Sequence, residues 1–568
     1  MCLYQNLNVL EIKIYIQSQK ILERHQKGKS LTSNENEGYR VVLTADRTLM
    51  SEYNGGIFLG FSACVPRGLI PDKLYFSLFC PSVETNQDGS VKYAPCGTRK
   101  IEAALLNNGF KREDVIVAHP EHLEKVVGPN TKVIGVTEND PLGMGPATST
   151  FTQLFGGEAY MAVKFRELLN HPAVQKNKPK IIVGGPGAWQ LEEREVRNKL
   201  GIDCVVIGEG EKVVGSLFEK AMNGEQLPEV VYGEVVDEDE MPLIKQATID
   251  GIIEIARGCG RGCDFCVPTL QRFRCLSIDY ILKEVEVNLR AGRRPLLHAE
   301  DVLRYKAKGL EVNKEAVINL FKTVKNYPSV PSVGLSHFAL SSVASAPDLV
   351  EEISNILDAG KDGGWLSGQT GIETGSPQLI KDHMMGKCRP FKSEDWPQVV
   401  VDAFQILSEN FWVPVATLII GLPGETEKDI ELTIDLINEL RNFKSLVVPL
   451  FLVSEGGLQG KAESFTVEKM TPKHSELFLK CWEHNLEWGD TFLKEYFVTQ
   501  GGGKGYALKL VFSYAIKQGK KLIEKCHNEY EYDLSAMIKD ARNGKINVAP
   551  LPIRFIYRAI KAKRSWRL

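Results

Sequence analysis

The sequence predicts an α/β protein with two successive parallel sheets and a helical region after them. From residue 98 onward, short apolar runs such as "EDVIVAHP", "TKVIGVTEND" and "PKIIVGGPG" alternate with amphipathic segments. This alternation is typical of a doubly wound parallel sheet with helices on both faces. A second alternating series begins at "GIIEIARGCG", and about six strand–helix units in it indicate a full or partial (β/α) barrel. Beyond residue 457 the pattern becomes helical.

These changes in pattern divide the chain into five segments. We expect a flexible leader over residues 1–38, a sheet domain over 39–230, a connector over 231–250, a barrel over 251–457 and a helical domain over 458–568. Within the sheet domain, "YRVVLTADRTLM" is interpreted as the first strand. The apolar runs "GIFLGFSACVP" and "KLYFSLFCP" are interpreted as two further short strands.

Composition excludes several functional classes. The formal net charge is −3 and the pI about 6.4, which argues against a general nucleic-acid or membrane surface. No run of about 18 apolar residues occurs, and the N-terminus lacks the pattern of a signal peptide. Most of the 12 cysteines are scattered and form no disulfide framework. We therefore expect a cytoplasmic protein.

Three cysteines stand together in "ARGCGRGCDFC". Cys259, Cys263 and Cys266 are spaced C-x-x-x-C-x-x-C, one ligand short of a closed zinc site, and no second C-x-x-C pair follows. A 4Fe–4S cluster fits this number better, because three thiolates leave one iron open to a small molecule. The glycines of the loop would allow it to wrap closely around such a cluster. The cysteines are the predicted metal ligands and the centre of catalysis.

With Phe265 in the aromatic position before the last cysteine, this motif resembles the signature of radical S-adenosylmethionine (SAM) enzymes. The resemblance implies that the open iron binds the amino and carboxylate groups of SAM, whose cleavage gives a 5′-deoxyadenosyl radical. Two later segments, "GQTGIETGSPQLIKDHMMGK" and "IIGLPGETEKD", resemble further stretches of the same family. The predicted SAM contacts that follow from the resemblance are Phe265, Glu300 or Asp301, Glu373, Thr374, Gly375 and Gly421.

A parallel sheet placed before such a barrel resembles the cobalamin-binding class of this family. Ligands of open α/β sheets bind at the carboxyl ends of the strands, where three glycine-rich loops are expected here. The predicted cobalamin contacts are Asp140, Pro141, Leu142, Gly143, Ser149, Thr150, Gly184, Gly185, Pro186, Glu209, Gly210 and Glu211. The D-x-H-x-x-G motif of many cobalamin proteins is missing, and we expect the nearest histidines, His119 and His122, to lie on the surface. A vestigial domain without cobalamin is therefore an open alternative.

Cobalamin and SAM together suit methyl transfer to an unactivated carbon, with an external electron donor. Stretches of residues 40–460 resemble archaeal, particularly methanogen, members of the class, some of which methylate methyl-coenzyme M reductase, including a glutamine. That reductase is the expected protein substrate. The alternatives are a cobalamin radical SAM enzyme with non-methylating chemistry, a methylthiotransferase, for which a second cysteine triplet is lacking, and a non-enzymatic binding protein.

Overall fold

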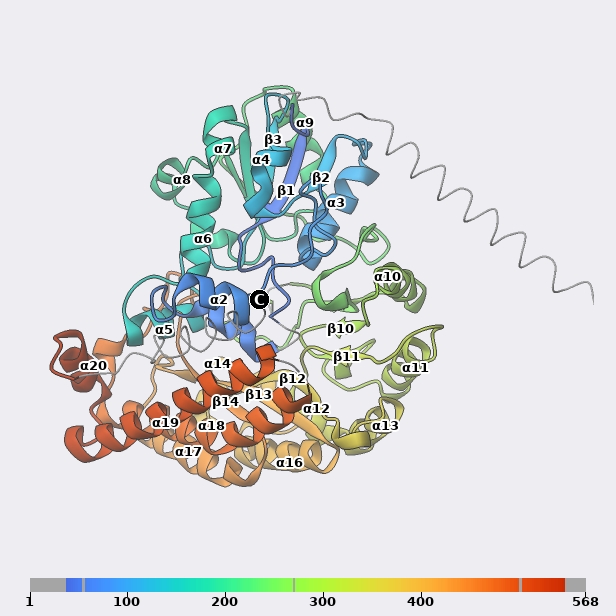
Figure 1. Cartoon of the computed structure of the whole chain (residues 1–568). Coiled ribbons are helices and arrows are strands. Elements are labelled where there is room, and N and C mark those ends of the chain that lie inside the picture. Colours follow the sequence, from blue (N-terminus) through green and yellow to red (C-terminus); the bar gives the residue numbers. More distant parts are fainter. Residues whose placement is uncertain (1–36, 54–56, 269–270, 500–502, 547–568) are drawn as a thin grey trace, which may run out of the picture.

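The computed structural model describes residues 37–53, 57–268, 271–499 and 503–546, and Figure 1 shows their arrangement. Nearly all of the predicted leader and the basic end of the chain lie outside these residues. The first sheet lies at the top of the view, the second group of strands below it, and the last helices cross the lower front. In the described part of the chain no helix is both long and apolar enough to cross a membrane.

The described part of residues 37–232 contains a six-stranded sheet in the order β2-β1-β3-β4-β5-β6, and its neighbouring strands pair in parallel. Its strands are β1 (Val41–Ala45), β2 (Val115–Val117), β3 (Val133–Thr137), β4 (Lys180–Gly184), β5 (Cys204–Ile207) and β6 (Val230–Tyr232). The chain leaves β1 on one side and returns on the other as β3, so the strand order reverses between these two strands. Their carboxyl ends form the crevice where doubly wound sheets bind ligands.

Helices cover both faces of this sheet because successive strand residues point to opposite sides. Val41 and Leu43 pack into one apolar cluster with residues of α3 and α9, whereas Val42 packs into another with residues of α6. The helices of this part are α2 (Asp72–Leu78), α3 (Cys96–Asn107), α4 (Leu123–Val126), α5 (Pro146–Phe155), α6 (Tyr160–Leu169), α7 (Pro172–Asn177), α8 (Arg194–Leu200) and α9 (Val214–Met222).

Two sequence predictions for this part are wrong. The run interpreted as a strand before Pro66 is a 3-10 helix over Ile57–Cys64, and the next is the helix α2. Short apolar runs do not distinguish a strand from a buried helical turn by periodicity. His119, expected on the surface, is buried, and its Nε2 lies 3.1 Å from the Ser82 hydroxyl. Burial lowers the pKa of His119 to about 3.

The second group of strands forms a partial barrel. In the described residues, parallel pairing joins β7, β10 and β11, and likewise β12, β13 and β14, while a parallel bridge between His337 and Gln369 links the two sets. The strands are β7 (Ile252–Glu254), β10 (Leu296–His298), β11 (Gly334–Leu335), β12 (Leu366–Glu373), β13 (Trp412–Ile420) and β14 (Leu446–Phe451). The helices between and beside them are α10 (Ile278–Arg290), α11 (Lys314–Lys325), α12 (Leu340–Ser345), α13 (Pro347–Ile356), α14 (Pro377–His383), α15 (Met385–Cys388), α16 (Trp396–Glu409) and α17 (Glu427–Glu439).

The long helices after the barrel close its β14 side. Helix α18 (Pro472–Thr499) packs beside β14, where Asn485 bonds both the amide and the carbonyl of Val447, at 2.7 and 2.6 Å. Helices α19 (Gly503–Tyr530) and α20 (Leu534–Arg542) follow. This agrees with the helical region predicted after the second sheet.

Candidate functional site

The three cysteines lie on one glycine-rich loop at the entrance to the barrel. The loop joins β8 (Ala256–Arg257) to β9 (Arg274–Cys275), which pair as an antiparallel hairpin directly after β7. Gly258, Gly260 and Gly262 flank the first two cysteines, and all three have positive φ, between 70° and 78°. Since other residues rarely adopt this conformation, the glycines let the loop curl within a few residues.

Glycines from other loops press against the cysteine loop. A β-carbon on Gly386 would lie 1.8 Å from the Arg261 carbonyl oxygen, and one on Gly456 would lie 2.9 Å from the Cys266 nitrogen. Gly386 belongs to the segment after β12, and Gly456 follows β14. Two segments that follow different strands of the same sheet therefore hold the loop by backbone approaches that only glycine permits.

We expect Gly386→Ala to loosen the cysteine loop, because the added methyl group must displace the Arg261 backbone. Iron retained after reconstitution and desalting should fall well below that of the unchanged protein. Gly60→Ala is the matched control, since among the described residues no atom beyond its chain neighbours lies within 4 Å of the added β-carbon. Equal iron retention in the two variants would contradict this role for Gly386.

Arg261, between the first two cysteines, anchors the loop from within. Its buried guanidinium donates to Asp301 Oδ2 at 2.8 Å and to the hydroxyls of Ser341 and Ser342 at 3.0 and 2.9 Å. Asp301 is thereby engaged, and its other oxygen accepts from the Leu303 amide. Glu300, the other predicted contact to the SAM amino group, is exposed and therefore remains the candidate for that contact.

The structure brings the cysteine loop together with both later motifs. His383 lies between them, with Nδ1 2.8 Å from Asp264 Oδ2 and Nε2 2.8 Å from the Pro423 carbonyl oxygen. Phe265, next to Asp264, packs partly buried against the barrel core. His383 was not among the predicted site residues, although it stands inside a motif that the sequence had singled out.

Glu373, a predicted SAM contact, ends β12 with a positive φ of 63°. Its carboxylate pairs with Lys387 at 2.8 Å and accepts from Thr417 Oγ1 at 3.2 Å. Thr374 and Gly375 instead contact Thr433 of α17, with the Thr433 hydroxyl 2.9 Å from the Gly375 nitrogen. These two residues therefore hold the end of β12 against a helix.

Gly421, the last predicted SAM contact, ends its strand under an aromatic ring. Its φ is 87°, and an added β-carbon would lie 2.0 Å from the Phe465 ring. Its amide donates to the Glu425 carboxylate at 2.9 Å. Glycine is required here by both the backbone conformation and the ring above it.

The donor set of the loop suits an iron–sulfur cluster. Burial raises the pKa of the Cys263 thiol to about 11, with Lys387 opposing the shift. Among the described residues, no three His, Cys, Asp or Glu side chains are grouped as a ready metal site. Bonds to iron would gather the sulfurs and release their protons, because metal binding is coupled to local folding and to thiol ionisation.

Two loops at the carboxyl ends of β3 and β4 pack closely against each other. Asp140 Oδ1 accepts from the amides of Met144 and Gly145 at 2.8 and 3.0 Å and from Gln190 at 2.7 Å. Gln190, which sequence reasoning missed, also accepts from the Leu142 amide at 2.9 Å. The predicted residues Pro141 and Gly143 belong to this same turn, and Gly143 has a φ of 73°.

The next loop, Gly184 to Pro186, approaches this turn through its glycines. A β-carbon on Gly185 would lie 2.5 Å from the Glu138 carbonyl oxygen. Ser149 and Thr150 lie on α5, where Ser149 accepts from Gln153. Thr150 accepts from the Phe451 amide at 2.8 Å and so joins the first sheet domain to the end of β14. The helix that follows the first predicted cobalamin loop therefore packs against the barrel.

A buried pair of acids lies at the strand-order reversal. Asp46 follows β1 and Glu138 follows β3, and Glu138 Oε1 accepts from the Asp46 amide at 3.1 Å. Asp46 Oδ2 and Glu138 Oε2 are buried without a hydrogen-bond partner among the described residues. Burial raises the pKa of Asp46 to about 6 and that of Glu138 well above its ordinary value. Acidic residues directly after two neighbouring strands were the sequence signal that could have found the pair.

We expect Asp46→Asn to stabilise the protein at pH 7 to 8. The pKa of Asp46 is higher in the folded state than in the unfolded state. Protonated Asp46 therefore stabilises the fold fully below about pH 4, and this stabilisation is lost as pH rises through about 6. Asparagine keeps an acceptor for Thr48 but carries no charge, and the gain should be on the order of 2 kcal/mol. Urea unfolding at pH 5 and pH 8 checks this, and a gain that does not grow with pH would contradict it.

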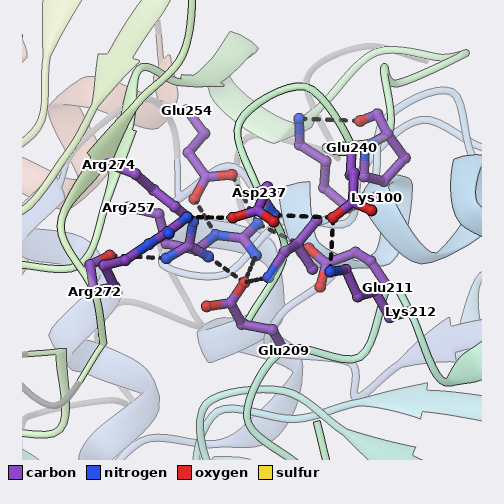
Figure 2. A network of polar contacts seen from close by, with 12 residues as sticks. Lys100, Glu209, Glu211, Lys212, Asp237, Glu240, Glu254, Arg257, Arg272 and Arg274 are labelled. Atoms are coloured by element: carbon purple, nitrogen blue, oxygen red, sulfur yellow. Dashed lines mark hydrogen bonds and ion pairs between the residues drawn. The ribbon is translucent and has the colours of Figure 1, made fainter. Parts of the chain in front are cut away.

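The acidic side chains of the third predicted cobalamin loop form ion pairs with arginines. Figure 2 shows Glu209 and Glu211, on either side of Gly210, within a network of ion pairs around Arg257. Arg257 bonds Glu209 at 2.9 Å, Glu211 at 2.8 Å and Glu254 at 2.6 Å, and Arg274 also pairs with Glu209. Arg257 and Arg274 are cross-strand partners on the hairpin that carries the cysteine loop. The carboxylates therefore tie the first domain to that hairpin.

Comparisons with known proteins agree with this organisation. The family description "Radical SAM superfamily" matches residues 253–437. An uncharacterized methyltransferase of Pyrococcus horikoshii is 24% identical over 339 residues, which cover 54% of this chain and 66% of that protein. A tRNA-2-methylthio-N(6)-dimethylallyladenosine synthase of Thermosipho melanesiensis is 24% identical over 302 residues, covering 49% of this chain and 62% of that protein. The chain spans less than two thirds of either relative.

Among solved structures, the radical S-adenosylmethionine methyltransferase TsrM of Kitasatospora setae, with cobalamin and a [4Fe-4S] cluster bound, matches with a TM-score of 0.48. The identity is 14%, covering 74% of this chain and 77% of that one. The cysteine hairpin, the strands after it and the family match agree with one another: residues 253–437 of this chain are similar to the radical SAM superfamily.

Proposed function

We propose that this protein is a cobalamin-dependent radical SAM methyltransferase that acts on an unactivated carbon. The observation that supports this most directly is the contact between Thr150 and the Phe451 amide, by which the helix after a glycine-rich loop of the doubly wound sheet meets the last strand of the barrel. Bound together, the cofactors would supply a 5′-deoxyadenosyl radical to remove hydrogen and a methyl group for the resulting carbon radical.

The chain's own residues would hold and orient these groups. Cys259, Cys263 and Cys266 would bind three irons of the cluster. Glu300 and Glu373 would accept hydrogen bonds from SAM, with Lys387 fixing the Glu373 carboxylate at 2.8 Å. The turn held by Asp140 and the loop at Gly185 would bind the corrinoid. Polar side groups of the corrinoid could then form hydrogen bonds with the unpaired oxygens Asp46 Oδ2 and Glu138 Oε2.

The substrate that we propose is a glutamine side chain of methyl-coenzyme M reductase, with electrons from an external donor. This choice rests on the resemblance of the sequence to methanogen members of the class. The alternatives are radical chemistry without methylation and a sheet domain without cobalamin. Both leave the cysteine loop with the same role.

Anaerobic reconstitution of the full chain with iron, sulfide and hydroxocobalamin tests the proposal. A methyltransferase should retain corrinoid through desalting, visible in its absorption spectrum. With SAM and a peptide spanning the glutamine, it should form both S-adenosylhomocysteine and 5′-deoxyadenosine. Only 5′-deoxyadenosine would indicate non-methylating chemistry, and failure to retain corrinoid would overturn the methyltransferase assignment.

A further inference from the structure

Arg304 is a buried arginine beside the cysteine loop that has no acidic partner. It ends a 3-10 helix over Val302–Arg304 and is 2% exposed. Its Nη1 donates to the Cys259 carbonyl oxygen at 2.8 Å, and its Nη2 donates to the Gly309 carbonyl oxygen at 2.6 Å. The guanidinium also lies over the Phe273 ring, 4.6 Å from the ring centroid. Among the described residues it forms no ion pair, and its Nε is buried without a hydrogen-bond partner.

The groups around Arg304 are either neutral or already paired. The two carbonyl oxygens and the ring face attract a cation, but none of them carries a net charge. Asp301, at the start of the same helical turn, pairs with Arg261 at 2.8 Å, and Glu373 pairs with Lys387 at 2.8 Å. Burial and the charge of Arg261 lower the pKa of Arg304, and their effect exceeds the opposing effect of Asp301. The described residues therefore leave one positive charge uncompensated beside the cysteine loop.

An uncompensated buried charge points to an anion that the chain itself does not supply. Burial without a counter-charge is costly, so buried charges in proteins are paired or bind a ligand. The iron–sulfur cluster proposed for the cysteine loop is such an anion, because three thiolates outweigh the positive charge of the four-iron core. Its negative charge grows when the cluster accepts an electron, and net charge is one of the properties that set its reduction potential.

We propose that Arg304 is the counter-charge of the iron–sulfur cluster and makes its one-electron reduction easier. The positive charge favours the reduced cluster, which is the more negative of the two forms, so it raises the reduction potential. The electron comes from the external donor and stays on the cluster, and Arg304 gains and loses no proton. The inference rests on the iron–sulfur part of the proposed function and is independent of cobalamin and of the substrate.

Two substitutions separate the charge of Arg304 from its shape. Arg304→Gln removes the charge but keeps an N–H donor, whereas Arg304→Lys keeps the charge but loses the planar fork that bonds two carbonyl oxygens. The full chain is reconstituted with iron and sulfide, without SAM or cobalamin. The reduction potential of its cluster is then measured by a redox titration with dithionite and titanium(III) citrate, followed by electron paramagnetic resonance.

The ratio of reduced to oxidised cluster in Arg304→Gln should be about tenfold lower at a given potential. This corresponds to a shift of about 59 mV to more negative potential for a one-electron couple. Arg304→Lys should stay close to the unchanged protein. The shift should be equal at about 0.05 M and about 0.5 M salt, because buried charges are screened much less than exposed ones.

Arg290→Gln is the matched control. Arg290 lies on α10, pairs with Glu286 and is 72% exposed, so solvent and salt already screen its charge. Its removal should leave the potential unchanged. A shift as large as that of Arg304→Gln would mean that the overall charge of the protein matters and would overturn the inference.

An unchanged potential in Arg304→Gln, or an equal shift in Arg304→Lys, would overturn the inference. So would a shift that appears only with SAM bound, because the charge would then serve the SAM carboxylate. Loss of the cluster from both variants would overturn it as well, since the fork and not the charge would be needed. Loss from Arg304→Gln alone would support it, because Arg304→Lys would show that a positive charge is sufficient.

The two proposals fail in different ways. If the unchanged chain assembles no cluster, the proposed function falls together with the inference. If the cluster assembles and its potential does not depend on the charge at position 304, only the inference falls. The redox titration needs no turnover, so an enzyme that does not methylate leaves the inference standing.

Discussion

Replacing Cys263 with alanine is expected to abolish assembly of the iron–sulfur cluster. The loop would then offer two sulfur ligands to a cluster of four irons, and two thiolates leave two irons unprotected. Iron should fall from about four per chain to well below one after anaerobic reconstitution and desalting. Formation of 5′-deoxyadenosine from SAM should be lost with it. Iron and sulfide analysis with the visible spectrum measures the first effect, and chromatography the second.

Cys275→Ala is the matched control. Cys275 lies on β9 of the same hairpin and accepts from the Lys306 amide at 3.1 Å, so it belongs to the local structure but not to the triplet. It should retain the full cluster. Full iron content in Cys263→Ala, or equal losses in the two variants, would contradict the assignment of the triplet as the ligand set.

Arg257→Met is expected to destabilise the junction between the two domains by about 3 kcal/mol or more. The side chain of Arg257 is 15% exposed and forms ion pairs with Glu209, Glu211 and Glu254. The substitution removes this positive charge from Glu211 and Glu254. Removing one member of a buried ion pair costs about 3–5 kcal/mol because the other charge remains buried. Thermal unfolding and retention of iron by the cysteine hairpin measure the effect.

The pH dependence gives this prediction a second readout. Arg257 holds the pKa of Glu254 at about 2, so in the unchanged protein this stability is present above about pH 4.5 and lost as pH falls through about 2. Without Arg257, burial dominates and the folded pKa of Glu254 lies above its unfolded value. The loss in Arg257→Met should therefore shrink as pH falls from 7 to 5.

Arg272→Met provides the comparison on the same hairpin. Arg272 pairs with Asp237, but their side chains are 53% and 48% exposed. Exposed pairs contribute about 0–1 kcal/mol, so this variant should be nearly neutral. Figure 2 shows both arginines, and similar destabilisation by both substitutions would mean that the buried ion pairs of Arg257 are not what holds the hairpin to the first domain.

The sequence predicted the α/β class and the order of its two sheets, because alternating strands and helices leave a periodic pattern over many residues. It did not predict the helical turn at Ile57–Cys64 or the burial of His119. A run of eight apolar residues fits a strand or a helix equally well, and a histidine's burial depends on what packs over it. Both are decided by neighbours distant in the chain.

The candidate site also contains features that the sequence predicted and features that it did not. The cysteine triplet could be recognised in the sequence because its three ligands lie within eight consecutive residues at a characteristic spacing. Asp301, Glu209 and Glu211 were equally visible, but each was predicted to contact a cofactor, and their carboxylates instead bind Arg261, Arg257 and Arg274. Local spacing determined the chemistry of the loop. Only the tertiary structure decided which arginines these carboxylates bind, because the contacts join residues tens of positions apart in the chain.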